Sequence, residues 1–163
     1  MPTAMRPFYR VTWLLLLILA LFTVLFPVLD LVGTARTGLP SDHTAAYRAL
    51  AGHGFPGLQP AGPARYIRQL EYGYALHELT FALFFLVLVA IPVRTGQRWA
   101  WLACWLILIA TVGYTLTFAR YSGKTLTYSL IPDVAIPVLL LAQAPRFWTP
   151  RTRGTEHADA SAR

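Results

Sequence analysis

The sequence carries little charge. Only 13% of its 163 residues are charged, whereas 56% are hydrophobic and the mean hydropathy is +0.49. Soluble globular domains carry about 25% charged residues. The shortage of charge therefore excludes an ordinary soluble domain of this size and predicts one integral-membrane domain.

Cysteine pairs, basic runs and a signal cleavage site are also missing. Cys104 is the single cysteine, which excludes an intramolecular disulfide and a cysteine-based metal site. The net charge of +7 comes from scattered residues between apolar segments, so we predict no nucleic-acid partner. Phe26-Pro27-Val28-Leu29-Asp30 ends the first apolar run without small residues, so we expect a transmembrane helix there and no cleavable signal peptide.

The sequence contains four long apolar segments. They predict transmembrane helices over residues 11–30, 66–91, 99–119 and 125–144. The expected fold is an all-α integral-membrane bundle of four helices within residues 1–148. Pro27, Pro132 and Pro137 lack the backbone N–H that a helix needs and predict kinks. Residues 149–163 are polar and basic, and we expect a disordered tail.

The connection between the first two helices, residues 33–65, is long and rich in glycine and proline. A short helix is predicted over residues 42–50, capped by Ser41 or Asp42. A connection this long is either a lid or disordered. Its apolar residues favour a packed lid: Leu39, Leu50, Phe55 and Leu58. Its polar residues are expected to be solvated: Asp42, His43 and His53.

The basic residues predict the orientation. If both termini lie in the cytoplasm, the inner side holds eight basic residues and the outer side holds six. The inner residues are Arg6, Arg10, Arg94, Arg98, Arg146, Arg151, Arg153 and Arg163. The outer residues are Arg36, Arg48, Arg65, Arg68, Arg120 and Lys124. The inner residues lie close to helix ends, where positive charge determines topology. We expect cytoplasmic termini in a bacterial inner membrane or the endoplasmic reticulum.

The second helix must carry charge into the membrane. Its uncharged run, residues 79–93, spans about 22 Å at 1.5 Å per residue, whereas a hydrocarbon core of about 30 Å needs about 20 residues. A transmembrane span must therefore include His77 and Glu78. An ionisable residue at that depth is a functional-site hypothesis.

Other polar residues are predicted at a similar depth. Asp30 ends the first helix on the outer side, and Asp133 lies eight residues into the fourth helix. Glu71, Tyr74 and Glu78 share one helical face. The candidate ligand-binding residues are Asp30, Glu71, Tyr74, Glu78, Phe81, Tyr114, Tyr128 and Asp133. For an enzyme, the candidate catalytic residues are His77, Glu78 and Asp133.

Three kinds of site fit these residues. The first is a structural network in which the carboxylates bond to tyrosine, threonine and Arg120 and hold the helices in register. The second is a metal site of Asp30, His77, Glu78 and Asp133, although the sequence lacks a recognised ligand spacing. The third is a ligand or catalytic pocket, in which a pair of acids shares a proton, binds a cationic amine or stabilises a carbocation. We favour the third and predict no metal or cofactor.

Four passages together resemble the EXPERA-domain membrane proteins, most closely the sigma-2 receptor branch and more distantly the emopamil-binding sterol isomerases. They are Phe26-Pro27-Val28-Leu29-Asp30-Leu31 with Gly38-Leu39-Pro40, Phe55-Pro56-Gly57-Leu58-Gln59-Pro60, His77-Glu78-Leu79-Thr80-Phe81-Ala82-Leu83-Phe84-Phe85, and Leu130-Ile131-Pro132-Asp133-Val134-Ala135-Ile136-Pro137 with Pro145-Arg146-Phe147-Trp148. The resemblance covers residues 11–148. It lies in the order and spacing of the passages.

The resemblance implies four helices, cytosolic termini, a sterol-sized cavity open to the bilayer and homodimers. It also implies that Asp30 and Glu78 are the ligand-binding acids. The isomerases have a histidine and a glutamate one turn apart, whereas His77 and Glu78 are adjacent here. Binding of a sterol-like or isoprenoid lipid, or of a cationic amphiphile, is therefore the first hypothesis. A lipid double-bond isomerase and a structural or chaperone-like membrane protein are the alternatives.

Overall fold

The computed structural model describes residues 7–58 and 62–148, and the predicted tail lies outside them. The described residues form helices and contain no strand, which confirms the all-α class. The elements are α1 (Pro7–Thr37), α2 (His43–Ala51), α3 (Pro63–Leu88), a π-helical turn (Val89–Val93), α4 (Arg98–Cys104), α5 (Ile107–Thr117), a 3₁₀ turn (Ala119–Tyr121) and α6 (Gly123–Trp148).

Four helical stretches of the described chain are long and apolar enough to cross a membrane: Pro7–Thr37, Pro63–Val93, Arg98–Tyr121 and Gly123–Trp148. The protein is therefore an all-α, multi-pass membrane protein. The first span continues beyond the predicted residue 30, to Thr37. It ends where Gly38 takes a left-handed φ of 86° and donates its N–H to the carbonyl of Thr34.

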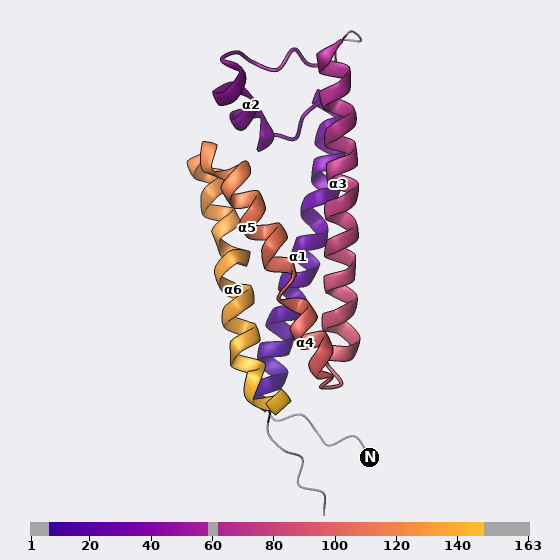
Figure 1. Cartoon of the computed structure of the whole chain (residues 1–163), viewed down its shortest axis with the longest axis vertical. Helices are drawn as coiled ribbons and strands as arrows, with labels where there is room; N and C mark the ends of the chain where they lie inside the picture. Colours follow the sequence, from indigo (N-terminus) through magenta and orange to yellow (C-terminus); the bar gives the residue numbers. More distant parts are fainter. Residues whose placement is uncertain (1–6, 59–61, 149–163) are drawn as a thin grey trace, which may run out of the picture.

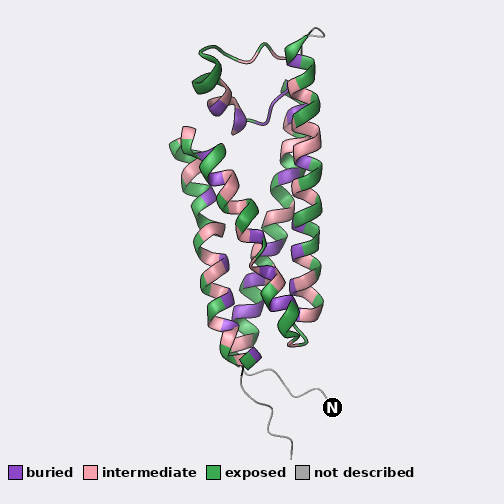
Figure 2. Ribbon diagram, viewed as in Figure 1, coloured by how far each residue is buried: buried purple, intermediate pink, exposed green. Residues whose placement is uncertain are grey.

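Three helix pairs make the main contacts of the bundle. α1 packs against both α3 and α6, and α5 packs against α6. The beginning of α1 and the end of α6 lie together at one end of the bundle, and α2 lies at the opposite end (Figure 1). The buried hydrophobic core is concentrated toward the end that carries the chain termini (Figure 2). The α2 end has fewer buried apolar side chains and leaves room for a cavity.

Two tryptophans fix the helices at the packed end. The indole N–H of Trp13 donates to the carbonyl of Val89 at 2.8 Å, and that of Trp101 donates to the carbonyl of Leu140 at 2.9 Å. Both bonds are buried. Pro92 lacks an N–H and lies within the π-helical turn that ends the second span. Each tryptophan therefore ties one helix to the backbone of another.

The third span is not the continuous helix predicted over residues 99–119. It is interrupted between α4 and α5, where Trp105 and Leu106 bond three residues back, to Leu102 and Ala103. Such bonds tighten the chain into a 3₁₀-like turn. The prediction failed here because neither glycine nor proline marks the break in the sequence.

The short helix of the long connection is confirmed as α2. Asp42 accepts the N–H of His43 at its start, and Gly52 ends it in the left-handed conformation. Gly38 has no side chain and so leaves room for Phe55: a Cβ there would lie 2.7 Å from the Phe55 ring. We call residues 38–58 the cap. Its Leu39 is buried, whereas Leu50 is exposed.

Candidate functional site

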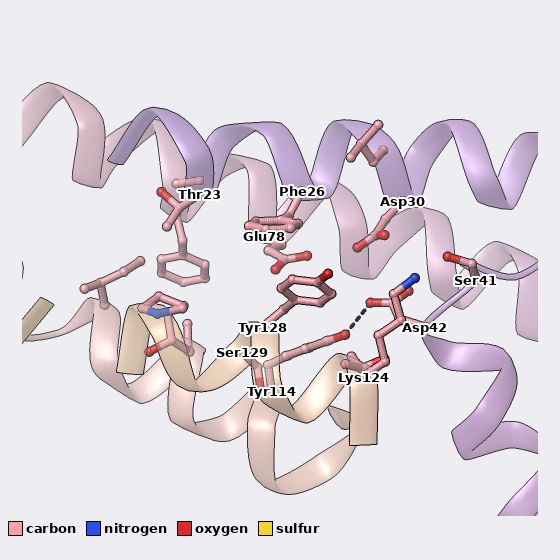
Figure 3. A pocket seen from close by; sticks show the side chains of 18 residues that line it. Thr23, Phe26, Asp30, Ser41, Asp42, Glu78, Tyr114, Lys124, Tyr128 and Ser129 are labelled. Atoms are coloured by element: carbon pink, nitrogen blue, oxygen red, sulfur yellow. Dashed lines mark hydrogen bonds between the residues drawn. The ribbon is translucent and has the colours of Figure 1, made fainter. Parts of the chain in front are cut away.

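A cavity of about 340 Å³ lies between the helices beneath the cap. The lining side chains come from α1, the cap, α3, α5 and α6 (Figure 3); many of them are polar, but the surface that they present to the cavity is mostly apolar. They are Thr23, Phe26, Leu29, Asp30, Ser41, Asp42, Glu78, Phe81, Ala82, Ile107, Ala110, Thr111, Tyr114, Lys124, Thr125, Tyr128, Ser129 and Pro132. Apolar walls with a few polar groups are typical of ligand pockets.

Asp30 and Glu78, which we call the acid pair, enter this cavity from α1 and α3. Their carboxylates point into the space between the helices (Figure 3). One oxygen of Glu78, Oε2, is buried and has no hydrogen-bond partner among the described residues. Within residues 7–58 and 62–148, the one ion pair joins His43 to Glu71. The acid pair therefore has no cation at pairing distance in this part of the chain.

A third carboxylate reaches the cavity from the cap. The hydroxyl of Tyr114 in α5 donates to Asp42, and both residues line the cavity (Figure 3). Asp42 is half-buried, so the prediction that it is solvated was wrong. The hydrogen bond ties the start of α2 to α5 beside the cavity.

His43 is the second residue that was wrongly predicted to be solvated. Its side chain is 2% exposed, and Nδ1–H donates to Glu71 Oε2 at 2.6 Å. Its ring stacks on Phe118, with centroids 4.3 Å apart and planes 11° from parallel. The rings of Tyr74 and Tyr114 lie beside it. His43 therefore fastens the cap to α3 and to the end of α5.

The environment of His43 raises its pKa. Burial by itself lowers the pKa, because it disfavours the charged imidazolium. The hydrogen bond and charge of Glu71, with the charges of Asp42 and Asp30, act in the opposite direction and prevail. The pKa of His43 therefore lies above its ordinary value of 6.5, and the protonated form pairs with Glu71.

Raising the pH is expected to loosen the cap. When the pKa of a histidine is higher in the folded state than in the unfolded state, protonation stabilises the folded state. This stabilisation is complete at pH values below the pKa of the unfolded state, which is 6.5 for His43. The stabilisation is lost as the pH rises through the higher, folded-state pKa. After correction for base catalysis, amide exchange of residues 43–51 should accelerate above pH 6.5 in the wild type. His43→Gln should abolish this dependence, and a wild-type profile without it would contradict the role of His43.

The structure distributes the other predicted residues among four places. Phe81, Tyr114 and Tyr128 line the cavity with the acid pair, whereas Glu71 and Tyr74 lie outside the lining, beside His43. Asp133 does not line the cavity, and its Oδ2 accepts a 2.7 Å hydrogen bond from Thr115. His77 is exposed on α3.

The structure also bears on the two other kinds of site, the structural network and the metal site. Arg120 bonds to Tyr121, whereas the structural network placed it beside the carboxylates. The bond between Asp133 and Thr115 does join α5 to α6 as such a network requires. In the described part of the chain, no group of three or more histidine, cysteine, aspartate or glutamate residues is placed to hold a metal ion.

The sequence did contain a signal for the missed residues. His43 and Ala46 are one turn apart in the predicted short helix and follow the apolar Leu39 and Pro40 by a few residues, and all four are buried. Such spacing indicates a buried helical face. The polarity of Asp42 and His43 favours exposure, and here the spacing is the better indicator.

The site can hold positive charge next to an apolar body. The acid pair offers carboxylate oxygens, the walls offer aromatic and aliphatic surface, and Asp42 of the cap and Lys124 of α6 add one charge of each sign (Figure 3). Comparison with known proteins finds no matching family model, no similar curated protein and no similar solved structure.

Proposed function

We propose that the cavity binds an amphiphile whose cationic amine pairs with Asp30 and Glu78. The observation that carries this proposal is the acid pair itself, which faces one cavity and has no basic group at ion-pair distance among the described residues, although Lys124 also lines that cavity. Unpaired carboxylates in an apolar setting are costly. A ligand ammonium supplies the missing charge and hydrogen-bond donors.

The walls allow the apolar body of a ligand to extend beyond the cavity. Phe26, Leu29, Phe81 and Tyr128 line the cavity and are 47%, 53%, 58% and 55% exposed. Because these walls also face outward, the hydrocarbon part of a ligand can continue into the bilayer. A volume of about 340 Å³ lies in the lower part of the range for small-molecule pockets, about 300–1,000 Å³. Together with the resemblance to EXPERA-domain proteins, this supports a sterol-like or isoprenoid lipid or a cationic amphiphile.

We also propose that both termini are cytoplasmic and that the cavity lies in the outer half of the membrane. The packed end of the bundle carries Arg94, Arg98 and Arg146 next to the helix ends, and positive residues in that position favour the cytoplasmic side. A reporter fused to either end tests this orientation.

A lipid double-bond isomerase is the second candidate. It is favoured by the partnerless oxygen of Glu78, which enters a cavity also lined by the ring of Tyr128. In this reaction Glu78 protonates an alkene, the ring stabilises the carbocation, and the carboxylate of Asp30 removes a different proton. Incubation with a panel of unsaturated polycyclic lipids decides between the two: shifted double bonds indicate the isomerase, and unchanged lipids favour binding alone.

Filling the cavity tests the proposed function directly. Ala110 lines the cavity, and phenylalanine in its place occupies the space that a ligand needs. We expect mass spectrometry to detect lipid co-purifying with the wild type at several times the level seen with Ala110→Phe. Val112→Phe is the control, because Val112 lies two residues away on α5, is 39% exposed and does not line the cavity. Equal lipid in all three proteins would refute the binding site.

A further inference from the structure

Arginines gather at the end of the bundle opposite the cavity. We call Arg10, Arg94, Arg98 and Arg146 the arginine end; they come from α1, the turn after the second span, the start of α4 and the end of α6. Arg146 donates to the carbonyls of Val93 and Arg94 at 3.2 and 2.5 Å. These bonds hold the turn that carries Arg94 against the last turn of α6.

Aromatic rings position two of the guanidinium groups. Arg94 lies over the ring of Trp13 at 5.2 Å, and Arg98 lies over the ring of Trp148 at 5.3 Å. Trp13 is itself fixed by its hydrogen bond to Val89. Both arginines are exposed. Stacking on a ring leaves the edge of a guanidinium available to donate hydrogen bonds.

No acidic residue of the described chain lies near this end. The nearest along the helices are Glu78, 16 residues before Arg94, and Asp133, 13 residues before Arg146. Thirteen helical residues correspond to about 20 Å, which exceeds the Debye length of about 8 Å at physiological salt. The positive charges of Arg94 and Arg98 are therefore not neutralised by carboxylates within residues 7–58 and 62–148.

This end also has features of a membrane surface. Trp99 and Trp148 are 57% and 55% exposed beside the arginines. Exposed tryptophans mark the depth of lipid headgroups, and basic pockets between helix ends bind anionic headgroups. A guanidinium group at this level can form bidentate hydrogen bonds to the phosphate oxygens of an anion.

We propose that the arginine end binds the headgroup of an anionic phospholipid in the leaflet on the side of the chain termini. Arg94 and Arg98 supply the phosphate contacts, Arg10 adds charge one turn before Trp13, and Arg146 holds the turn in place. This site is separate from the cavity and does not depend on the cavity's function.

Lipid titration of the purified protein in neutral detergent tests the proposal. Native mass spectrometry compares phosphatidylglycerol with phosphatidylcholine of identical acyl chains. We expect the wild type to bind phosphatidylglycerol about 10-fold more tightly, and Arg94→Gln with Arg98→Gln to lose most of that preference. Arg36→Gln with Arg48→Gln removes the same charge from exposed residues at the cavity end and should leave the preference unchanged.

Two further experiments complete the test. One distinguishes a loss of charge from a loss of folding, and the other distinguishes binding of a lipid headgroup from binding of a free anion. Arg94→Lys with Arg98→Lys keeps the charge and should retain part of the preference, even if the glutamine variant is unstable. Inorganic phosphate at the lipid concentration should not displace phosphatidylglycerol. Equal wild-type affinity for the two lipids, full preference in the glutamine variant, or displacement by free phosphate would each overturn the proposal.

Discussion

Asp30→Asn should weaken binding of a cationic amphiphile by about 10- to 100-fold, the effect of losing one charge-assisted hydrogen bond of about 1.5–3 kcal/mol. The side chain keeps its size and loses the charge that pairs with the ligand amine. A neutral analogue of the same apolar body should bind the variant about as well as the wild type, because the walls formed by Phe26, Phe81 and Tyr128 remain. Titration of both ligands by a fluorescence or scintillation assay gives the two ratios.

Glu78→Gln should have an effect in the same direction, because the second acid faces the same cavity. Asp133→Asn is the matched control: it makes the same chemical change as Asp30→Asn in a residue that bonds to Thr115 and does not line the cavity. If Asp133→Asn weakens amine binding as much as Asp30→Asn does, the ligand lies elsewhere.

His43→Ala should release the cap. The wild-type imidazole is buried, pairs with Glu71 and stacks on Phe118. Its loss leaves a cavity beside Phe118 and a carboxylate without its cation, a combination that costs about 2–4 kcal/mol in comparable sites. A loss of about 2 kcal/mol increases amide exchange of residues 43–51 about 30-fold. Mass-detected hydrogen exchange on the intact membrane protein measures the change.

The His43→Ala variant also tests whether the cap controls the rates of ligand binding and release. Ser41 and Asp42 line the cavity and belong to the cap, so ligand association and dissociation should both become faster. His77→Ala is the control, because His77 is exposed on α3 and its removal should leave exchange of α2 unchanged. Protection of residues 43–51 that survives His43→Ala would show that other contacts hold the cap.

Periodicity and length predicted the helices well because the membrane imposes both. A hydrocarbon core of about 30 Å requires long apolar segments, and the lengths of these segments are enough to place Glu78 within a span. Asp30 was predicted from its place at the end of the first apolar run, and the structure brings it to the same cavity as Glu78.

Tertiary contacts explain what the sequence did not predict. Asp42 and His43 look like loop residues, but Tyr114, Glu71 and Phe118 provide half-buried partners from spans far away in the chain. Asp133 was predicted at a depth similar to that of the acid pair, yet its hydrogen bond to Thr115 directs it toward the contact between α5 and α6. Depth can be calculated from residue counts, whereas the direction of a side chain depends on how the helices are rotated.

Photolabelling is the most direct test of a ligand in this cavity. A cationic amphiphile with a photoreactive group on its apolar body is added to membranes that contain the intact protein, and the labelled residues are mapped by mass spectrometry. We predict labels on residues of the cavity wall, such as Phe26, Phe81 and Tyr128, that disappear when unlabelled amine is in excess and in the Asp30→Asn, Glu78→Gln double variant. Labels spread over outward-facing residues such as Leu21, Phe84 and Val138, unaffected by the competitor or the double variant, would contradict the proposed binding site.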